Sequence, residues 1–213
     1  MCFSATASFV AGSTLAAIGA TTIRMTSRRA EIPFAMIPLL FGVQQLTEGM
    51  IWLSFRGESY LPNAALTLVY SLFSHVLWPI FIPLAVGLLE TDPLSKKAVA
   101  ACQFAGAVVG LYLLYVIVQF PVTSRVLDNH IAYESPHFYR LPLMFLYLTA
   151  TCASGIFSSS KVIQVFGALT LATFLAAYAI HAATFFSVWC FFAAILSMII
   201  FYYFGQARLG ARI

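Results

Sequence analysis

The sequence predicts an all-α protein, a bundle of seven transmembrane helices with its N-terminus outside and its C-terminus in the cytoplasm. Three observations predict this fold. Of the 213 residues, 62% are hydrophobic and only 8% are charged, whereas soluble domains carry about 25% charged residues. The apolar stretches run for about 20 residues each, which is the length of a helix that crosses a bilayer core. The basic residues also sort to one side of these stretches.

Seven apolar stretches divide the chain, and we expect each to be a transmembrane helix. Their ranges, in chain order, are 4–24, 33–55, 64–89, 98–120, 138–158, 162–184 and 186–204. A helix is the expected spanning element because lipid offers no partners to backbone N–H and C=O groups. No internal repeat or soluble domain separates the stretches. The prediction is therefore a single bundle formed by residues 1–213.

The basic residues of the connections predict the orientation of the bundle. One set of connections carries Arg24, Arg28, Arg29, Lys96, Lys97, Lys161, Arg208 and Arg212, whereas the other carries only Arg56, Arg125 and Arg140. Cytoplasmic loops hold an excess of Lys and Arg, so the first set is expected in the cytoplasm. The net charge of +4 then reflects topology and attraction to anionic lipid. It requires no nucleic-acid partner, and the bilayer is the expected environment.

The first helix has small residues at every fourth position. Ser4, Ser8, Gly12, Ala16 and Ala20 form this series. Small residues let membrane helices pack closely. We expect this face to hold the N-terminus against the bundle.

The second helix contains Glu48, the only acidic residue well inside an apolar stretch. A carboxyl group in the bilayer is costly and usually faces the bundle interior, where it has partners. The predicted orientation places Glu48 in the outer half of the membrane. Gln44 and Trp52 lie one turn away on the same face, and Gln45 flanks it.

The third helix places His75 near the middle of the membrane, with Ser71 one turn closer to the outer side. Pro79 follows four residues after His75, and proline has no N–H to donate to the carbonyl of that residue. We therefore expect a kink that opens space beside the histidine.

The remaining candidate residues lie at the same predicted depth. The connection of residues 121–137 is expected to be a solvated loop. After it, His181 lies near the outer end of the sixth helix and Cys190 about one turn into the seventh. The residues expected to converge in the outer half come from five helices and are Cys2, Glu48, His75, His181 and Cys190.

This combination of side chains predicts a metal site. Thiolate, imidazole and carboxylate groups suit zinc, and thiolate with imidazole also suits copper. Gln44, Gln45 and Ser71 would hold the ligands in position. Glu48 would be either a ligand or the catalytic general base that activates a metal-bound water. The function predicted is that of a metal-dependent membrane hydrolase or redox enzyme acting on a small molecule or lipid.

Other interpretations of the same residues stay open. Cys2 and Cys190 could form a disulfide in an oxidising compartment. Glu48 and His75 could instead relay a proton or cation in a small transporter, although few polar residues continue toward the inner side. A non-catalytic binding or sensor protein is the third class. The substrate and the oligomeric state do not follow from the sequence.

Three segments carry a resemblance to a known family. They are residues 1–9, Met-Cys-Phe-Ser-Ala-Thr-Ala-Ser-Phe, residues 37–45, Ile-Pro-Leu-Leu-Phe-Gly-Val-Gln-Gln, and residues 187–194, Ser-Val-Trp-Cys-Phe-Phe-Ala-Ala. They resemble the segments of an uncharacterised family of small bacterial integral membrane proteins with seven helices. The resemblance implies a bacterial cytoplasmic membrane and names no activity.

A weaker resemblance is to the ceramidase-like membrane hydrolases, which are zinc-dependent. Ser71 and His75 have the Ser-x-x-x-His spacing of that superfamily. The aspartate and the H-x-x-x-H pair that accompany it are missing from the expected spans, so the likeness is one of analogy. A retinal protein is excluded because no stretch has a lysine in its interior to form the Schiff base.

Overall fold

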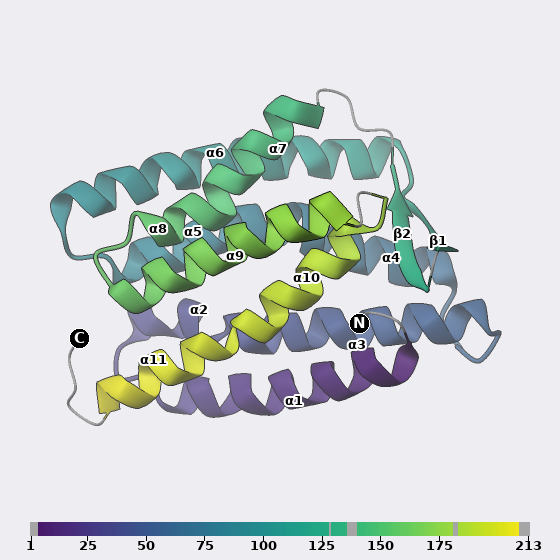
Figure 1. The fold of residues 1–213 in the computed structure, drawn as a ribbon, viewed down its shortest axis with the longest axis horizontal. Helices are drawn as coiled ribbons and strands as arrows, with labels where there is room; N and C mark the ends of the chain where they lie inside the picture. Colours follow the sequence, from purple (N-terminus) through teal and green to yellow (C-terminus); the bar gives the residue numbers. More distant parts are fainter. Residues whose placement is uncertain (1–3, 128, 136–139, 181–182, 209–213) are drawn as a thin grey trace.

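The computed structural model describes residues 4–127, 129–135, 140–180 and 183–208. These residues are almost entirely helical, which confirms the all-α prediction, and a two-stranded antiparallel hairpin is added at one end (Figure 1). The elements are α1 (Ala5–Arg24), η1 (Arg29–Glu31), α2 (Ile32–Ala35), α3 (Ile37–Phe55), α4 (Asn63–Ser71), η2 (Leu72–Leu77), α5 (Trp78–Leu89), α6 (Pro93–Gln119), β1 (Thr123–Leu127), β2 (His130–Glu134), α7 (Arg140–Leu148), η3 (Thr149–Ala153), α8 (Ser154–Ile156), α9 (Lys161–Ile180), α10 (Phe185–Leu196) and α11 (Met198–Arg208).

Six helical stretches in the described residues are long and apolar enough to cross a membrane. They are Ala5–Arg24, Arg29–Phe55, Asn63–Leu89, Pro93–Gln119, Lys161–Ile180 and Phe185–Gln206. The segment expected as the fifth span holds a shorter apolar helix, Leu141–Ile156. A helical membrane bundle is therefore supported, and the seventh crossing stays a prediction.

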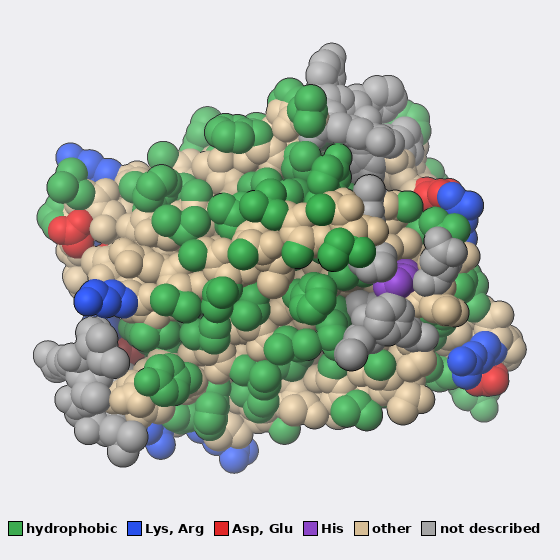
Figure 2. Space-filling view, in the orientation of Figure 1, with side chains coloured by type: hydrophobic (Ala, Val, Ile, Leu, Met, Phe, Trp, Pro, Cys, Tyr) green, Lys and Arg blue, Asp and Glu red, His purple; other side chains and the backbone are tan. Residues whose placement is uncertain are grey.

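The two ends of the bundle differ in composition. We call one the hairpin end, because it carries β1, β2 and the α3–α4 connection. We call the other the basic end, which carries Arg24, Arg28, Arg29, Lys96, Lys97, Lys161 and Arg208. In Figure 2 the charged side chains gather at the two ends, and apolar side chains cover the surface between them. This distribution suits a molecule whose middle lies in lipid.

Helices α1 and α3 pack closely through glycines. A Cβ atom at Gly12 would lie 2.8 Å from Cγ of Leu46, and one at Gly19 would lie 2.3 Å from the backbone nitrogen of Leu39. The buried face of α1 consists of Ala5, Ser8, Gly12, Leu15, Gly19 and Thr22. The predicted series of every fourth residue is confirmed as far as Ala16, which is half-buried and whose backbone nitrogen would lie 2.7 Å from a Cβ atom at Gly42, whereas Ala20 is exposed. A spacing of four drifts around a 3.6-residue helix by about 40° per step.

A π-helix interrupts the third span at the position predicted for a kink. The N–H of Trp78 bonds to the carbonyl of Phe73, five residues earlier. The next donor in this register would be Pro79, which has no N–H, so the carbonyl of Ser74 has no helical partner. The hydroxyl of Tyr147 in α7 donates to that carbonyl. The spacing to Pro79 predicted that the carbonyl of His75 would be freed, and the π register moves the freed carbonyl by one residue, to Ser74.

Helix α6 crosses this interruption at close range. A Cβ atom at Gly106 would lie 1.8 Å from the carbonyl oxygen of Pro79 and 3.1 Å from Cβ of Ala150 in η3. One at Gly110 would lie 3.2 Å from the carbonyl oxygen of Val76. Only residues without side chains fit there. The glycines of α6 therefore fix both π-helices, η2 and η3, against the same helix.

The two halves of the interior are built differently. The basic half is filled by an apolar cluster that includes Phe34, Phe41, Ile82, Phe166 and Phe204. The buried polar side chains of the candidate site lie in the central and hairpin-end parts of the bundle and are Gln44, Gln45, Glu48, Ser71, Ser74, His75 and Ser187. The basic half also holds buried polar groups, such as Glu90 and Ser158, near its end. The candidate site therefore lies on the hairpin side of a closed apolar core.

Candidate functional site

Glu48 is fully buried at the meeting point of three elements. Helix α3 carries it, and Ser187 at the start of α10 donates a hydrogen bond of 2.6 Å to its Oε1. The hydroxyl of Tyr133 in β2 donates to the same oxygen at 3.4 Å. A buried polar group needs such partners because lipid and apolar side chains supply none. The three segments are held together around this carboxyl group.

The hairpin is the element that brings Tyr133 to Glu48. Strands β1 and β2 are antiparallel, with Ser124 opposite Tyr133. The ring of Tyr133 stacks on that of Tyr70 in α4, with 4.3 Å between centroids and an interplanar angle of 4°. Residues His130 to Tyr133 are all buried. The prediction of a solvated loop for residues 121–137 is therefore wrong for β2, because its apolar side chains pack on α10 and the aromatic rings.

Two glutamines on α3 lie beside the acid. Gln44 accepts a hydrogen bond of 2.7 Å from the indole nitrogen of Trp78, and its side chain also approaches Cys190. Gln45 is fully buried, and within the described residues its side-chain amide has no hydrogen-bond partner. Ser71 also has its hydroxyl buried without a partner in the described part of the chain. The hairpin half thus holds more polar groups than its protein contacts use, which is typical of functional sites.

His75 lies in η2, inside the interruption of the third span. One side of its ring is engaged by Ser74, whose Oγ lies 2.7 Å from Nδ1 of the imidazole. The ring of Phe186 packs on it with 4.5 Å between centroids. Although His75 is only 2% exposed, it lines a large cavity. Interruptions of this kind, which re-aim side chains, recur at functional sites.

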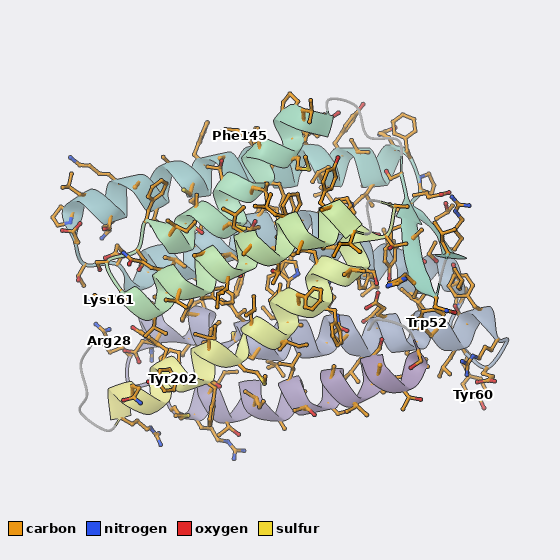
Figure 3. All side chains as sticks on the ribbon, viewed as in Figure 1. Arg28, Trp52, Tyr60, Phe145, Lys161 and Tyr202 are labelled. Carbon is orange, nitrogen blue, oxygen red and sulfur yellow. The ribbon has the colours of Figure 1, made fainter. Side chains whose placement is uncertain are left out.

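The large cavity has a volume of about 840 Å³ and lies between the hairpin and helices α6, α7, α9 and α10. Its polar lining consists of His75, Thr123, Arg125, Tyr133, Glu134 and Ser135. Its aromatic lining consists of Tyr147, Phe174, Tyr178, Phe185, Phe186 and Trp189. Helix α7 presents Leu143 and Met144 to the cavity, whereas Phe145 points away from the bundle (Figure 3). The volume falls within the range of small-molecule sites, about 300–1,000 Å³.

Cys190 lines a second and much smaller cavity. It has a volume of about 30 Å³ and is also lined by Thr151, Thr170 and Tyr147. A space of this size holds a water molecule and no larger ligand. Cys190 itself is buried and forms no disulfide with the other described cysteines, Cys102 and Cys152. The structure therefore brings Cys190 close to Gln44 but gives it a different cavity from His75.

The predicted metal ligands are described only in part. Cys2 and His181 lie outside the described residues, and with Cys2 the disulfide to Cys190 stays a prediction. Among the residues that the structure describes, no three His, Cys, Asp or Glu side chains gather as a metal site would require. Zinc or copper binding by Glu48, His75, Cys190 and the two residues outside the described ranges also stays a prediction.

The hydrogen-bond partners of Glu48 were not predicted from the sequence. Ser187 and Tyr133 lie 139 and 85 positions away from Glu48, and no local spacing connects them. A signal for the hairpin was present, because Thr123, Val126, Ile131 and Tyr133 are strand-forming types on either side of Asn129, which adopts a positive φ of 57°.

A second buried acid lies at the basic end. Glu90 follows α5 and is 5% exposed. Its carboxylate accepts hydrogen bonds from the backbone N–H groups of Thr91, Asp92 and Ser159 and from the hydroxyls of Ser158 and Ser159. Burial raises the pKa of Glu90, but the hydrogen bonds from Ser159 and Ser158 outweigh it and set the pKa below its ordinary value. This carboxylate ties the α5–α6 connection to the α8–α9 connection.

Comparison with known proteins places the chain in a family. A family of unknown function, DUF6629, matches residues 1–212. The chain belongs to this family. No curated protein and no solved structure matches it. The resemblance to an uncharacterised family is thereby confirmed, whereas the bacterial origin and the analogy to ceramidase-like hydrolases stay predictions.

Proposed function

We propose that this protein binds an amphipathic small molecule or lipid in the large cavity at its hairpin end, with His75 and Glu48 as acid–base groups beside the ligand. The observation that carries the proposal is the cavity of about 840 Å³, which His75 and Tyr133 line together with aromatic and aliphatic side chains. Small-molecule sites combine mostly apolar walls with a few convergent polar groups. This cavity has both.

Tyr133 connects Glu48 to the cavity. Its side chain lines the cavity and its hydroxyl donates to the carboxyl group. Tyr133 and Ser187 each bond to Glu48 through a hydroxyl, which can donate to a carboxylate or accept from a carboxylic acid. The site can therefore hold Glu48 in either protonation state. Ionisable residues inside membranes are usually functional, and proton exchange with a bound molecule is the function that this arrangement supports.

The cavity wall reaches the lipid-facing surface. Leu141 of α7 and Tyr178 of α9 both line the cavity and are 74% and 44% exposed. A ligand can therefore enter from the bilayer as well as from the hairpin end. The excess of basic residues at the opposite end predicts that the hairpin end faces the outside. The proposed site is then an outer-leaflet site, in a bacterial inner membrane if the predicted origin holds.

A transporter is the less favoured function. Transport requires polar groups that continue to the other side, and the basic half is occupied by the apolar cluster around Phe41, Ile82 and Phe166. Gln164, one of the few polar residues there, donates to the carbonyl of Ser158 near the basic end. The polar site is therefore one-sided.

The test is to identify what stays bound to the purified protein. Native mass spectrometry of the full chain, extracted in a mild detergent, should show one retained small molecule. Met144→Trp should remove most of that adduct because the larger ring occupies the cavity. Val118→Trp is the matched control, since Val118 is a 68% exposed residue of α6 that does not line the cavity. Equal adducts in both variants would contradict the proposal.

The metal prediction can be tested on the same sample. Elemental analysis that finds near-stoichiometric zinc or copper, lost in Glu48→Gln, would restore the metalloenzyme as the preferred function. A metal-free protein that still retains its small molecule would support the binding function alone.

A further inference from the structure

We infer that the ligand of the large cavity is an uncharged amphiphile with a planar head group that carries hydrogen-bond acceptors, the chemistry of a quinone-type lipid. The inference rests on the proposed function and specifies the class of ligand. Four features of the cavity carry it, namely its aromatic wall, its charge balance, its polar floor and its apolar opening.

The aromatic wall is continuous. Phe174 lies at its centre, with ring centroids 5.9 Å from Phe185, 5.1 Å from Trp189 and 5.9 Å from Tyr178. Phe185 in turn contacts Phe186 at 4.0 Å. Rings that hold a cation stand apart and present their faces to it. Here the rings contact one another, with Phe174 edge to face on Phe185 and Trp189, and form a wall against which a flat group packs.

The charges that line the cavity are already paired with each other. Arg125 of β1 and Glu134 of β2 form an ion pair, with 2.5 Å between Nη2 and Oε1 and a second contact of 2.6 Å from Nε. The described lining includes no other Lys, Arg, Asp or Glu. A charged head group would lose its hydration and find no unpaired Lys, Arg, Asp or Glu among the described lining residues. An uncharged head group does not incur that cost.

The polar floor suits hydrogen-bond acceptors. His75 and Tyr133 both line the cavity. An imidazole N–H can donate a hydrogen bond, and the hydroxyl of Tyr133, which donates to Glu48, can donate to a ligand instead when Glu48 is protonated and becomes the donor of that pair. The ring of Phe186 packs on that of His75 with 4.5 Å between centroids. Carbonyl oxygens on a planar ring are acceptors that such donors recognise.

The apolar opening suits a hydrocarbon tail. Leu141, Leu143 and Met144 of α7 line the cavity, and Leu141 is also exposed on the surface of the bundle. A ligand with its head group at His75 and Tyr133 would extend its tail past α7 into lipid. Burying such a tail contributes about 0.8 kcal/mol per methylene group.

The experiment uses the full chain in nanodiscs and three probes with the same decyl tail. They are 2-decyl-1,4-benzoquinone, decyltrimethylammonium and decyl phosphate. Quinones quench tryptophan fluorescence, and Trp189 lies in the cavity wall. We expect saturable quenching by the quinone. Either charged probe should displace the quinone only at concentrations roughly tenfold higher or more than that of the quinone, which corresponds to a difference in binding free energy of about 1.4 kcal/mol.

Matched tyrosine variants localise the binding. Tyr178→Ala removes a ring from the wall and should weaken quinone binding roughly tenfold. Tyr115→Ala removes a 60% exposed ring from α6 that does not line the cavity, and should leave binding unchanged. Displacement by a charged probe at equal or lower concentration would overturn the inferred head group and leave the proposed function intact. The inference would be overturned if quenching is not saturable, or if it is the same in both variants. If native mass spectrometry also shows no adduct, the proposed function would be overturned as well.

Discussion

Glu48 and Glu90 are both buried carboxyl groups, but they lie at opposite ends of the bundle and have different kinds of partners. Glu90 accepts from three backbone N–H groups and two serine hydroxyls. The partners identified for Glu48 are the hydroxyls of Ser187 and Tyr133. A backbone N–H only donates, whereas a hydroxyl donates or accepts.

The difference separates a structural acid from one suited to proton exchange. Around Glu90 the fixed donors favour the carboxylate, and its pKa lies below the ordinary value. Around Glu48 the hydroxyls can rotate to suit either protonation state, and Tyr133, which carries one of them, lines the large cavity. Burial alone does not distinguish the two residues, since both are almost fully buried. The two residues differ in the chemical type of their hydrogen-bond partners.

The largest expected effect is on stability, from Glu90→Gln. An amide has a single acceptor oxygen, and both oxygens of Glu90 accept from backbone N–H groups. The substitution therefore points an NH₂ group at a donor and should cost about 2–3 kcal/mol of unfolding free energy. Equilibrium unfolding in detergent measures it, with Glu58→Gln as the exposed control at the hairpin end. A loss no larger than that of the control would remove the structural role of Glu90.

The next effect concerns the π-helix that carries His75. Tyr147→Phe removes the donor to the carbonyl of Ser74, which Pro79 cannot replace. A buried carbonyl without a partner costs about 1–3 kcal/mol, so we expect a loss toward the lower end of that range. Tyr115→Phe, at an exposed site on α6, should be neutral. If the two variants unfold alike, Tyr147 does not stabilise the interruption.

The sequence predicted the features that depend on one segment at a time. The apolar stretches gave the helices, the isolation of Glu48 among apolar residues predicted its burial, and Pro79 predicted a break in the third span. Each of these follows from local composition or from a single backbone group. The donor to Ser74 could not be predicted in the same way, because it comes from another helix.

The candidate site was predicted less well because the sequence predicts how deep each residue lies in the membrane but not the direction in which its side chain points. His75 and Cys190 were expected to share a metal, yet they line separate cavities. Position along a helix fixes depth, whereas packing decides which direction a side chain faces. The glycines of α1 and α6 set that packing through contacts such as Gly106 with Pro79. A single sequence does not reveal such pairings.

The same substitution at the other acid should have a smaller effect on stability. In Glu48→Gln the hydroxyls of Ser187 and Tyr133 can donate to the amide oxygen or accept from its NH₂ group. We expect a loss within about 1 kcal/mol, clearly below that of Glu90→Gln. Quinone binding should be retained and should depend less on pH than in the wild type, because only His75 of the two proposed acid–base groups remains. A loss as large as at Glu90 would contradict the contrast between the two acids.

The smallest effect is the pH dependence of stability that Glu90 contributes. Its pKa is lower in the folded protein than its ordinary value of 4.5. Its contribution to stability is therefore fully present above pH 4.5 and is lost as the pH falls through the lower folded-state pKa. Unfolding measured between neutral pH and that acidic range should show stability declining in the wild type. The decline should be shallower in Glu90→Gln, which has no carboxyl group to titrate, and unchanged in Glu58→Gln. Equal slopes in all three proteins would show that the hydrogen bonds around Glu90 do not favour its ionised form.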